Sequence, residues 1–250
     1  EYKWSARLIT AELADRGHRI SLATVGRWLT RLGLNQRRWL DTDGEPTRTV
    51  GQITARYPGH MLHIDVKKVG AIRDGGGWRV HGRGSAQDKA NQRSPKVGYR
   101  YLHSAVDGFS RVAYTESLPN ERATTVVGFL NRAKAWFAGH GITSINRVVT
   151  DNGSCYRSAL FAHALTGWAH RHQFIAAYTP RHNGKVERYN RILAEEVLYA
   201  RAYASETERT RAIQIWNIHY NYHRPHTACR DQPPASKTPK RVTNLMRNNT

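Results

Sequence analysis

The sequence is poor in cysteine, in long apolar runs and in acidic residues. Its two cysteines, Cys155 and Cys229, lie far apart and show no CxxC spacing, which argues against a zinc finger or a disulfide framework and fits a reducing compartment. No apolar run approaches the roughly 18 residues of a membrane-spanning helix, and no secretory signal is present. We therefore expect a protein that has no membrane partner.

The shortage of acidic residues leaves the chain strongly basic. Its 39 Lys and Arg residues face only 19 Asp and Glu residues, so the formal net charge is +20 over 250 residues. A surplus of this size attracts polyanions and speeds association with them. A nucleic acid is therefore the expected partner, and a merely basic protein without such a partner is the alternative.

Residues 1–34 predict two short helices joined by a tight connection. The first pattern ends near Gly17, and Ser21 is a suitable N-cap for the second helix. One face of the second helix is apolar, with Leu22, Val25, Leu29 and Leu32. The other face carries Thr24, Arg27 and Arg31. This pattern is typical of a helix-turn-helix segment that contacts DNA, although a helical hairpin packed on the next domain would show it too.

Two further segments flank the expected core. Residues 35–59 resemble a basic linker in which Arg37 and Arg38 could lie along a DNA backbone, or simply belong to a solvated tether. Residues 201–250 predict one more amphipathic helix and a Pro-rich tail that is extended and partly mobile. The predicted apolar face of that helix holds Ala212, Ile215, Trp216, His219 and Tyr222.

Residues 60–200 alternate between strand and helix patterns, which predicts an α/β fold with a mixed sheet flanked by helices. The expected strands are Met61–Val66, Tyr99–Val106, Val112–Ser117, a run ending at Thr150, and Phe174–Tyr178. A glycine-rich, basic stretch from Gly70 to Pro95 interrupts the pattern. It lacks the Gly-Lys-Ser/Thr of a P-loop, so it is either a DNA-touching arm or a disordered insertion.

Three carboxylates stand out within this region. Asp65 lies inside an apolar strand, where burial is costly unless the carboxylate is paired with Lys67 or Lys68 or binds a metal. Asp151 follows a strand and opens an Asp-Asn-Gly turn, and Glu187 lies on a helix, where an ion pair with the residue at i+4 is the simpler explanation. Each signal is weak alone, but the three elements can converge on a pair of divalent metals. Because the chain is basic, a phosphodiester is the expected substrate.

Asp107 is the main rival for a catalytic place. It begins Asp107-Gly108-Phe109-Ser110-Arg111 at the end of a predicted strand, and a hairpin turn explains it well. We therefore assign it a structural role.

Several motifs together resemble a known family. They are His63-Ile64-Asp65, Asp107-Gly108-Phe109-Ser110-Arg111, Thr150-Asp151-Asn152-Gly153, Tyr178-Thr179-Pro180-Arg181-His182-Asn183-Gly184-Lys185-Val186-Glu187-Arg188 and Tyr222-His223-Arg224-Pro225-His226. Over roughly residues 60–240 the chain resembles the integrase catalytic core of bacterial insertion-sequence transposases, which are relatives of retroviral integrases with a DDE triad and an RNase H-like fold. The sequence departs from many relatives at His63, where they have Trp, and in the longer Gly70–Pro95 stretch.

The resemblance implies a function. Asp65, Asp151 and Glu187 would be the catalytic and metal-binding triad for two Mg²⁺ ions, with Mn²⁺ able to substitute. Metal-dependent cleavage would free a 3′-OH at each transposon end, and strand transfer would join it to target DNA. The implied partners are double-stranded DNA, both terminal repeats and target, and further copies of the chain in at least a dimer. The implied location is the bacterial cytoplasm, with the nucleoid when DNA is bound.

The expected DNA contacts cluster around the helix of Glu187. Its first turns carry Lys185, Arg188 and Arg191, and the helix N-terminus itself favours phosphate. His182 and Asn183 lie just before the helix and could touch the same strand. Two alternatives to a transposase stay open at this point. One is a structure-specific nuclease of the same fold, and the other is a non-enzymatic DNA-binding protein derived from a transposase.

Overall fold

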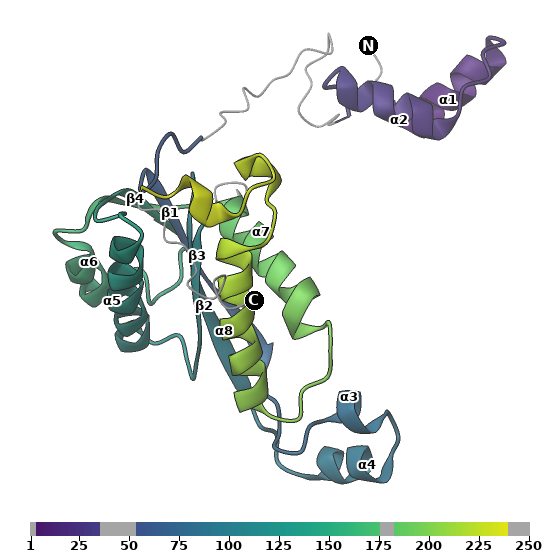
Figure 1. The fold of residues 1–250 in the computed structure, drawn as a ribbon. Coiled ribbons are helices and arrows are strands. Elements are labelled where there is room, and N and C mark those ends of the chain that lie inside the picture. The colour runs from purple at the N-terminus through teal and green to yellow at the C-terminus, as the bar shows by residue number, and fades with distance from the viewer. Residues whose placement is uncertain (1–3, 36–53, 176–182, 240–250) are drawn as a thin grey trace, which may run out of the picture. The chain divides into compact units, whose positions relative to one another are not determined.

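The computed structural model of the chain describes residues 4–35, 54–175 and 183–239. It divides into two compact units, Glu1–Ile53 and Thr54–Thr250, which are described separately below (Figure 1). In the described ranges, no helix has the length and apolar character needed to cross a membrane.

The first unit contains the two predicted helices, α1 (Ala6–Asp15) and α2 (Leu22–Arg31). The hydroxyl of Ser21 accepts a hydrogen bond from the Thr24 amide, which confirms the predicted N-cap. The predicted apolar face is only partly covered within the unit. Val25 is buried, whereas Leu22 is 50% exposed and Leu32 is 61% exposed. The two ends of this face are therefore largely accessible to solvent within the described residues.

The second unit is built on a five-stranded mixed sheet, as the sequence predicts. Its strands are β1 (Met61–Gly70), β2 (Tyr99–Asp107), β3 (Ala113–Leu118), β4 (Ile145–Thr150) and β5 (Ala169–Phe174). Their order across the sheet is β3-β2-β1-β4-β5. β1, β2 and β3 pair antiparallel, while β4 runs parallel to β1 and β5 runs parallel to β4. β1 is therefore the central strand.

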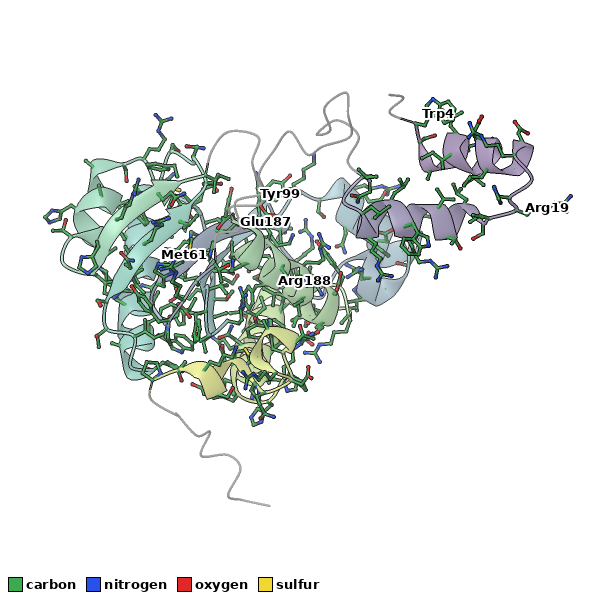
Figure 2. The ribbon with its side chains drawn as sticks, turned by 90° about the horizontal axis from the view of Figure 1, so that it is seen from above. Trp4, Arg19, Met61, Tyr99, Glu187 and Arg188 are labelled. Carbon is green, nitrogen blue, oxygen red and sulfur yellow. The ribbon has the colours of Figure 1, made fainter. Side chains whose placement is uncertain are left out.

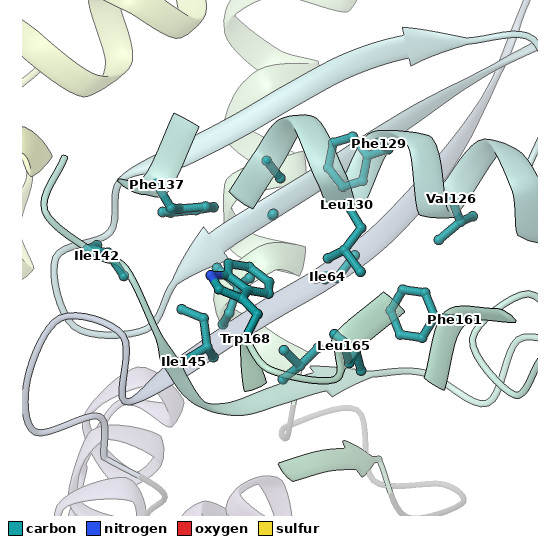
Figure 3. Packing of buried hydrophobic residues seen from close by; sticks show 14 of the residues in the cluster. Ile64, Val126, Phe129, Leu130, Phe137, Ile142, Ile145, Phe161, Leu165 and Trp168 are labelled. Carbon is teal, nitrogen blue, oxygen red and sulfur yellow. The ribbon is translucent and has the colours of Figure 1, made fainter. Parts of the chain in front are cut away.

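Helices cover both faces of this sheet (Figure 1). One layer is α5 (Ala123–Gly139) and α6 (Ala159–Leu165); the other is α7 (Gly184–Leu193), its continuation η3 (Ala194–Leu198), and α8 (Glu206–Tyr222). Between the sheet and the first layer, Ile64 packs with Phe129, Leu130, Phe161 and Trp168 (Figure 3). Full burial of such a side chain stabilises the fold by about 1.5–3 kcal/mol. Apolar packing alone therefore holds the central strand β1 in place.

One strand prediction and one of the two alternatives for a loop need correction. The last strand is Ala169–Phe174, which shares only Phe174 with the described part of the expected strand Phe174–Tyr178, and residues 176–178 of that expectation lie outside the described ranges. The strand was missed because it lies at the edge of the sheet, where its residues are polar and largely accessible. The Gly70–Pro95 stretch is not disordered. It contains the helices α3 (Trp78–His81) and α4 (Ala86–Arg93), the second of which is capped by Ser85.

The C-terminal predictions also need correction. α8 buries the expected Trp216, but its other buried apolar residues are Ile213 and Tyr220, and the expected Ile215 is 60% exposed. The Pro-rich tail is not extended throughout, because Pro234–Lys237 form a 3₁₀ turn and Ala235 joins the main core. α8 has buried Asn and Arg side chains on its inner face, and so the spacing of its apolar residues does not identify that face.

Candidate active site

The central strand β1 brings two of the predicted carboxylates together. β1 and β4 are parallel, with His63 paired to Val149. Asp65 and Asp151 each lie two residues further along. Because alternate residues of a strand point to one face, the same register carries both carboxyls to one side of the sheet. Asp65 is half-buried inside β1, and Asp151 is half-buried directly after β4.

The third carboxylate, Glu187, comes from α7, which packs against β1 and β2. Two asparagines fix this helix to β1. Asn183 donates from its side-chain amide to the Ile64 carbonyl at 3.3 Å, and Asn190 donates to Oδ2 of Asp65 at 2.8 Å. Residues at i, i+4 and i+7 lie along one helix face, so Glu187 sits between its two anchors and faces the same strand.

A groove of about 530 Å³ opens between β1 and α7. Its polar lining comprises Asp65, Lys67, Lys68, Glu187, Asn190, Arg191 and Glu195. Asp65 lies at its buried side, while Glu187 is exposed to solvent. The groove therefore leaves both carboxylates on one solvent-accessible surface.

The electrostatics of the groove link all three acids. Burial raises the pKa of Asp65, and the nearby charge of Asp151 raises it further, against the hydrogen bond from Asn190 and the charge of Lys67. Burial also raises the pKa of Glu187, and the charge of Asp65 adds to it, against Arg191. Asp65 thus repels both partners. A divalent cation would remove that repulsion, and an all-oxygen donor set is the kind that Mg²⁺ prefers.

The three carboxylates are neighbours rather than a closed cage. Across residues 4–35, 54–175 and 183–239, no three His, Cys, Asp or Glu side chains are close enough to enclose a metal ion. Asp65 is the member shared by the two repulsive pairs. The donor chemistry fits a divalent metal, and Asp65 is the residue around which it would be held.

Asp107 takes the structural position expected of it. Its carboxylate is fully buried and accepts hydrogen bonds from the amides of Gly59, Phe109 and Ser110 and from the Ser110 hydroxyl. Burial raises its pKa, and these hydrogen bonds act in the opposite direction. Asp107 therefore closes the turn between β2 and β3 instead of facing the groove.

The predicted DNA contacts around α7 are only partly accessible. Arg188 and Arg191 are exposed, and Lys185 is half-buried, with its pKa lowered by burial and by Arg111. The prediction for Asn183 is wrong, because its side chain is 2% exposed and is used to hold α7 on β1. His182 lies outside the described residues.

The DNA contacts predicted in the first unit lie on the surface of α2. On α2, Arg27 donates to the Thr24 hydroxyl at 3.2 Å, and the Arg31 guanidinium lies 5.1 Å from the ring centre of Trp28. Trp28 is 53% exposed, so the helix presents a basic and aromatic surface. Arg37 and Arg38 lie outside the described residues.

One residue of the site was missed by sequence reasoning. Asn190 holds the Asp65 carboxylate, yet an asparagine on a helix carries no signal of its own. The available clue was its spacing of three residues from Glu187, which places both on one face of α7.

Comparison with known proteins decides the class of the chain. The Integrase core domain model named rve matches residues 55–180, which is half of the chain, and a second Integrase core domain model, rve_3, matches residues 169–234.

The chain belongs to the integrase core domain family. Polynucleotidyl transfer in DNA integration is the class of reaction to which this family points.

A solved retroviral structure shows the same fold as this integrase core. A chain of the simian T-cell lymphotropic virus intasome, solved with the PP2A regulatory subunit B56 gamma, aligns with a TM-score of 0.58 at 21% identity, covering 96% of this chain and 76% of that one. The HTLV-2 integrase catalytic core domain in complex with magnesium, in a trimeric form, aligns with a TM-score of 0.49 at 16% identity, covering 73% and 97%. The predicted RNase H-like fold is confirmed by the first alignment and by the strand order.

Proposed function

We propose that this integrase core belongs to a DDE transposase, which cleaves DNA at the ends of its element and joins those ends to target DNA. One observation carries the proposal. The Asp65 carboxylate is held by Asn190 at 2.8 Å, and its charge is coupled to both Asp151 and Glu187. A basic chain in which one acid repels two others is suited to bind a cation and a polyanion together.

Asp65, Asp151 and Glu187 would hold two Mg²⁺ ions, with Mn²⁺ able to substitute. When bound, such ions activate the attacking oxygen and neutralise charge at the phosphodiester in an in-line displacement. In the first step, water attacks a phosphodiester at the element's end and frees a 3′-OH. In the second step, that 3′-OH attacks a target phosphodiester and displaces a target 3′ oxygen, so phosphodiester bonds are exchanged without a protein nucleophile.

The chain's own residues would position the reacting strands. Asn190 holds Asp65 in place on β1, while Arg188 and Arg191 lie exposed on the same helix as Glu187 and can bind backbone phosphates. Lys185 adds a third cation near the helix start. None of these contacts reads bases, so they would set position rather than sequence preference.

Sequence recognition is assigned to the first unit. We propose that residues 1–34 are a helix-turn-helix segment, that Thr24, Arg27 and Arg31 contact terminal-repeat DNA, and that Arg37 and Arg38 follow the backbone in the linker 35–59. Residues 60–200 would be the catalytic core, and residues 201–250 its C-terminal extension. Joining two ends at one target implies at least a dimer on DNA, in the bacterial cytoplasm and with the nucleoid.

The test is a joining assay with the full chain, labelled terminal-repeat DNA, a plasmid target and Mg²⁺. Asp65→Asn, Asp151→Asn and Glu187→Gln should each lower joining by roughly 1000-fold, since each removes several kcal/mol of charge stabilisation. DNA binding should persist in all three. Asp74→Asn is the matched control, because Asp74 is exposed and lies outside the groove.

Each alternative has its own outcome in this assay. Joined products from any triad variant at the level of the parent chain would sink the proposal. Cleavage of branched or hybrid DNA without any joining would identify a nuclease instead. An absence of Mg²⁺-dependent cleavage, with DNA binding retained, would identify a non-enzymatic DNA-binding protein.

A further inference from the structure

A second cavity lies on another side of α7, away from the carboxylates. It has a volume of about 540 Å³ and is bounded by the start of α7, the turn between β2 and β3, and the segment that follows α8. Its basic lining residues are Arg111, Lys185, Arg188, Arg224 and His226. No carboxylate is found among the described residues that line it. Two motifs far apart in the sequence, around Arg111 and around Arg224, therefore meet in one basic pocket, which we call the α7 basic pocket.

The cations of this pocket are mostly not neutralised by the protein. Among the described residues, the side chains of Arg111, Lys185 and Arg188 have no hydrogen-bond or ion-pair partner, and Nε of Arg111 is buried without one. Arg224 differs, because Glu196 binds its guanidinium at 2.7 Å. Three positive side chains thus surround one cavity with their charges unmatched, an arrangement that costs free energy unless an anion enters.

The backbone holds Arg111 in an unusual conformation at the pocket. Its φ of 70° lies in the left-handed region, which non-glycine residues seldom adopt. Asp107 enforces this turn: its side chain accepts from Ser110 at 2.7 Å, and its carbonyl accepts from the Arg111 amide at 3.0 Å. A strained backbone that is held so firmly is a frequent mark of a binding site. The buried Asp107 therefore positions Arg111 at the pocket.

The electrostatic effects of the pocket point the same way. The pKa of His226 is lowered to about 4, first by burial and then by Arg111, Arg224, Lys237 and Arg188. The cations therefore repel one another, as the carboxylates do in the groove. A bound anion would offset this repulsion.

We propose that the α7 basic pocket binds one phosphate group of a DNA backbone, as an anchor separate from the carboxylate groove. This inference rests on the proposed function, because it supplies a holding point for the strand that the carboxylates process. A guanidinium fork with an ammonium group suits the tetrahedral oxygens of a phosphate. The backbone N–H groups at the start of α7, near Gly184, also favour an anion.

Arg111→Gly is the sharpest variant for a test, because it removes the guanidinium while glycine accepts the positive φ. Arg230→Gly is its matched control. Arg230 also has a positive φ, of 57°, is exposed, and does not line the pocket. The two substitutions remove the same charge and relieve the same kind of backbone strain. Lys185→Gln serves as a second pocket variant that leaves the turn intact.

The experiment uses the full chain in EDTA, so that binding is measured without chemistry. Fluorescence anisotropy with a generic DNA duplex should show roughly ten-fold weaker binding for Arg111→Gly, with the salt dependence reduced by about one phosphate contact. Lys185→Gln should weaken binding in the same direction, and Arg230→Gly should stay near the parent chain. Inorganic phosphate should raise the melting temperature of the parent and of Arg230→Gly, but not of Arg111→Gly.

Two results would overturn the inference. One is equal DNA affinity for Arg111→Gly, Lys185→Gln and Arg230→Gly. The other is a phosphate-dependent melting shift that needs Arg111 while DNA affinity stays unchanged, which would make the pocket a free-phosphate site. Neither result touches the joining test of Asp65→Asn, because that test measures chemistry in Mg²⁺ at retained binding. The two proposals can therefore fail separately.

Discussion

The two sides of α7 carry charges of opposite sign, and on each side groups of like charge lie close together. On one side, the groove brings Asp65 and Glu187 together, and the charge of Asp65 adds to the burial that raises the pKa of Glu187. On the other, Lys185 and Arg188 line a cavity without any described carboxylate. Glu187 and Arg188 are consecutive residues on this helix (Figure 2). Successive helical residues point about 100° apart, so a single element can serve both environments.

The proposed roles follow from this difference, since one side of the helix would hold a metal and the other a phosphate. In each environment, like charges lie close together and are partly buried. Their pKa values therefore shift in the direction that favours the neutral form. Acids have raised pKa values in the groove, and bases have lowered ones in the pocket. Each side is therefore prepared for a ligand of opposite sign, and the predictions below test whether the two sides act independently.

The largest expected effect on stability separates two aspartates. Asp107→Asn should lower the free energy of unfolding by about 2–3 kcal/mol, because an amide group would face the donors of Gly59 and Ser110 in a buried turn. Asp65→Asn should not lower it, since it removes the repulsion with Asp151 and Glu187. Urea denaturation monitored by circular dichroism measures both. Equal losses in the two variants would contradict the distinct roles assigned to them.

Asn190 tests the groove at a smaller scale. Asn190→Leu should lower the joining rate by roughly 10- to 100-fold, as is common when the partner that orients a metal ligand is lost. DNA affinity should be unchanged, because Asn190 is buried and does not face the pocket. The free energy of unfolding should fall by at most about 1–3 kcal/mol, because leucine removes the hydrogen bond to Asp65 but also removes an Oδ1 atom that is buried without a hydrogen bond. A joining rate equal to that of the parent chain would contradict the role of Asn190 in positioning Asp65.

The smallest effect is a titration in the α7 basic pocket. His226 has its pKa lowered to about 4, partly by four surrounding cations, so it stays neutral through the mildly acidic range. Bound inorganic phosphate offsets those cations and should move the pKa of His226 upward, toward its ordinary value of 6.5. NMR of the imidazole protons follows this directly. Arg111→Gly should raise the pKa in the free protein and abolish the response to phosphate, and a downward shift with phosphate would be inconsistent with an anion in the pocket.

Much of the fold could be predicted because its inner strands are apolar and bounded by turns. β1 and β4 are rich in apolar residues, and Ser21 and Gly17 mark helix boundaries by their local chemistry. β5 could not be found this way, because an edge strand needs no apolar pattern. Trp216 was placed correctly and Ile215 was not, because buried asparagines on α8 break the periodicity of the helix.

The predicted carboxylates could be found because acids in or beside apolar strands are costly without a purpose. The residues that organise them were harder to find. Asn190 acts through a contact across 125 positions of sequence, and Arg111 reaches its pocket only because Asp107 sets a left-handed turn. Such roles depend on tertiary neighbours, and no spacing in the sequence reports them.

The most direct test compares the two consecutive residues of α7, Glu187 and Arg188, in the joining assay at saturating protein. We predict that Glu187→Gln loses joining while its DNA affinity equals that of the parent chain. We predict that Arg188→Gln binds DNA more weakly, yet joins at nearly the parent rate once the DNA is saturated. If Glu187→Gln joined DNA normally, or if both variants lost binding and joining together, the division of α7 into a catalytic side and a phosphate-holding side would be contradicted.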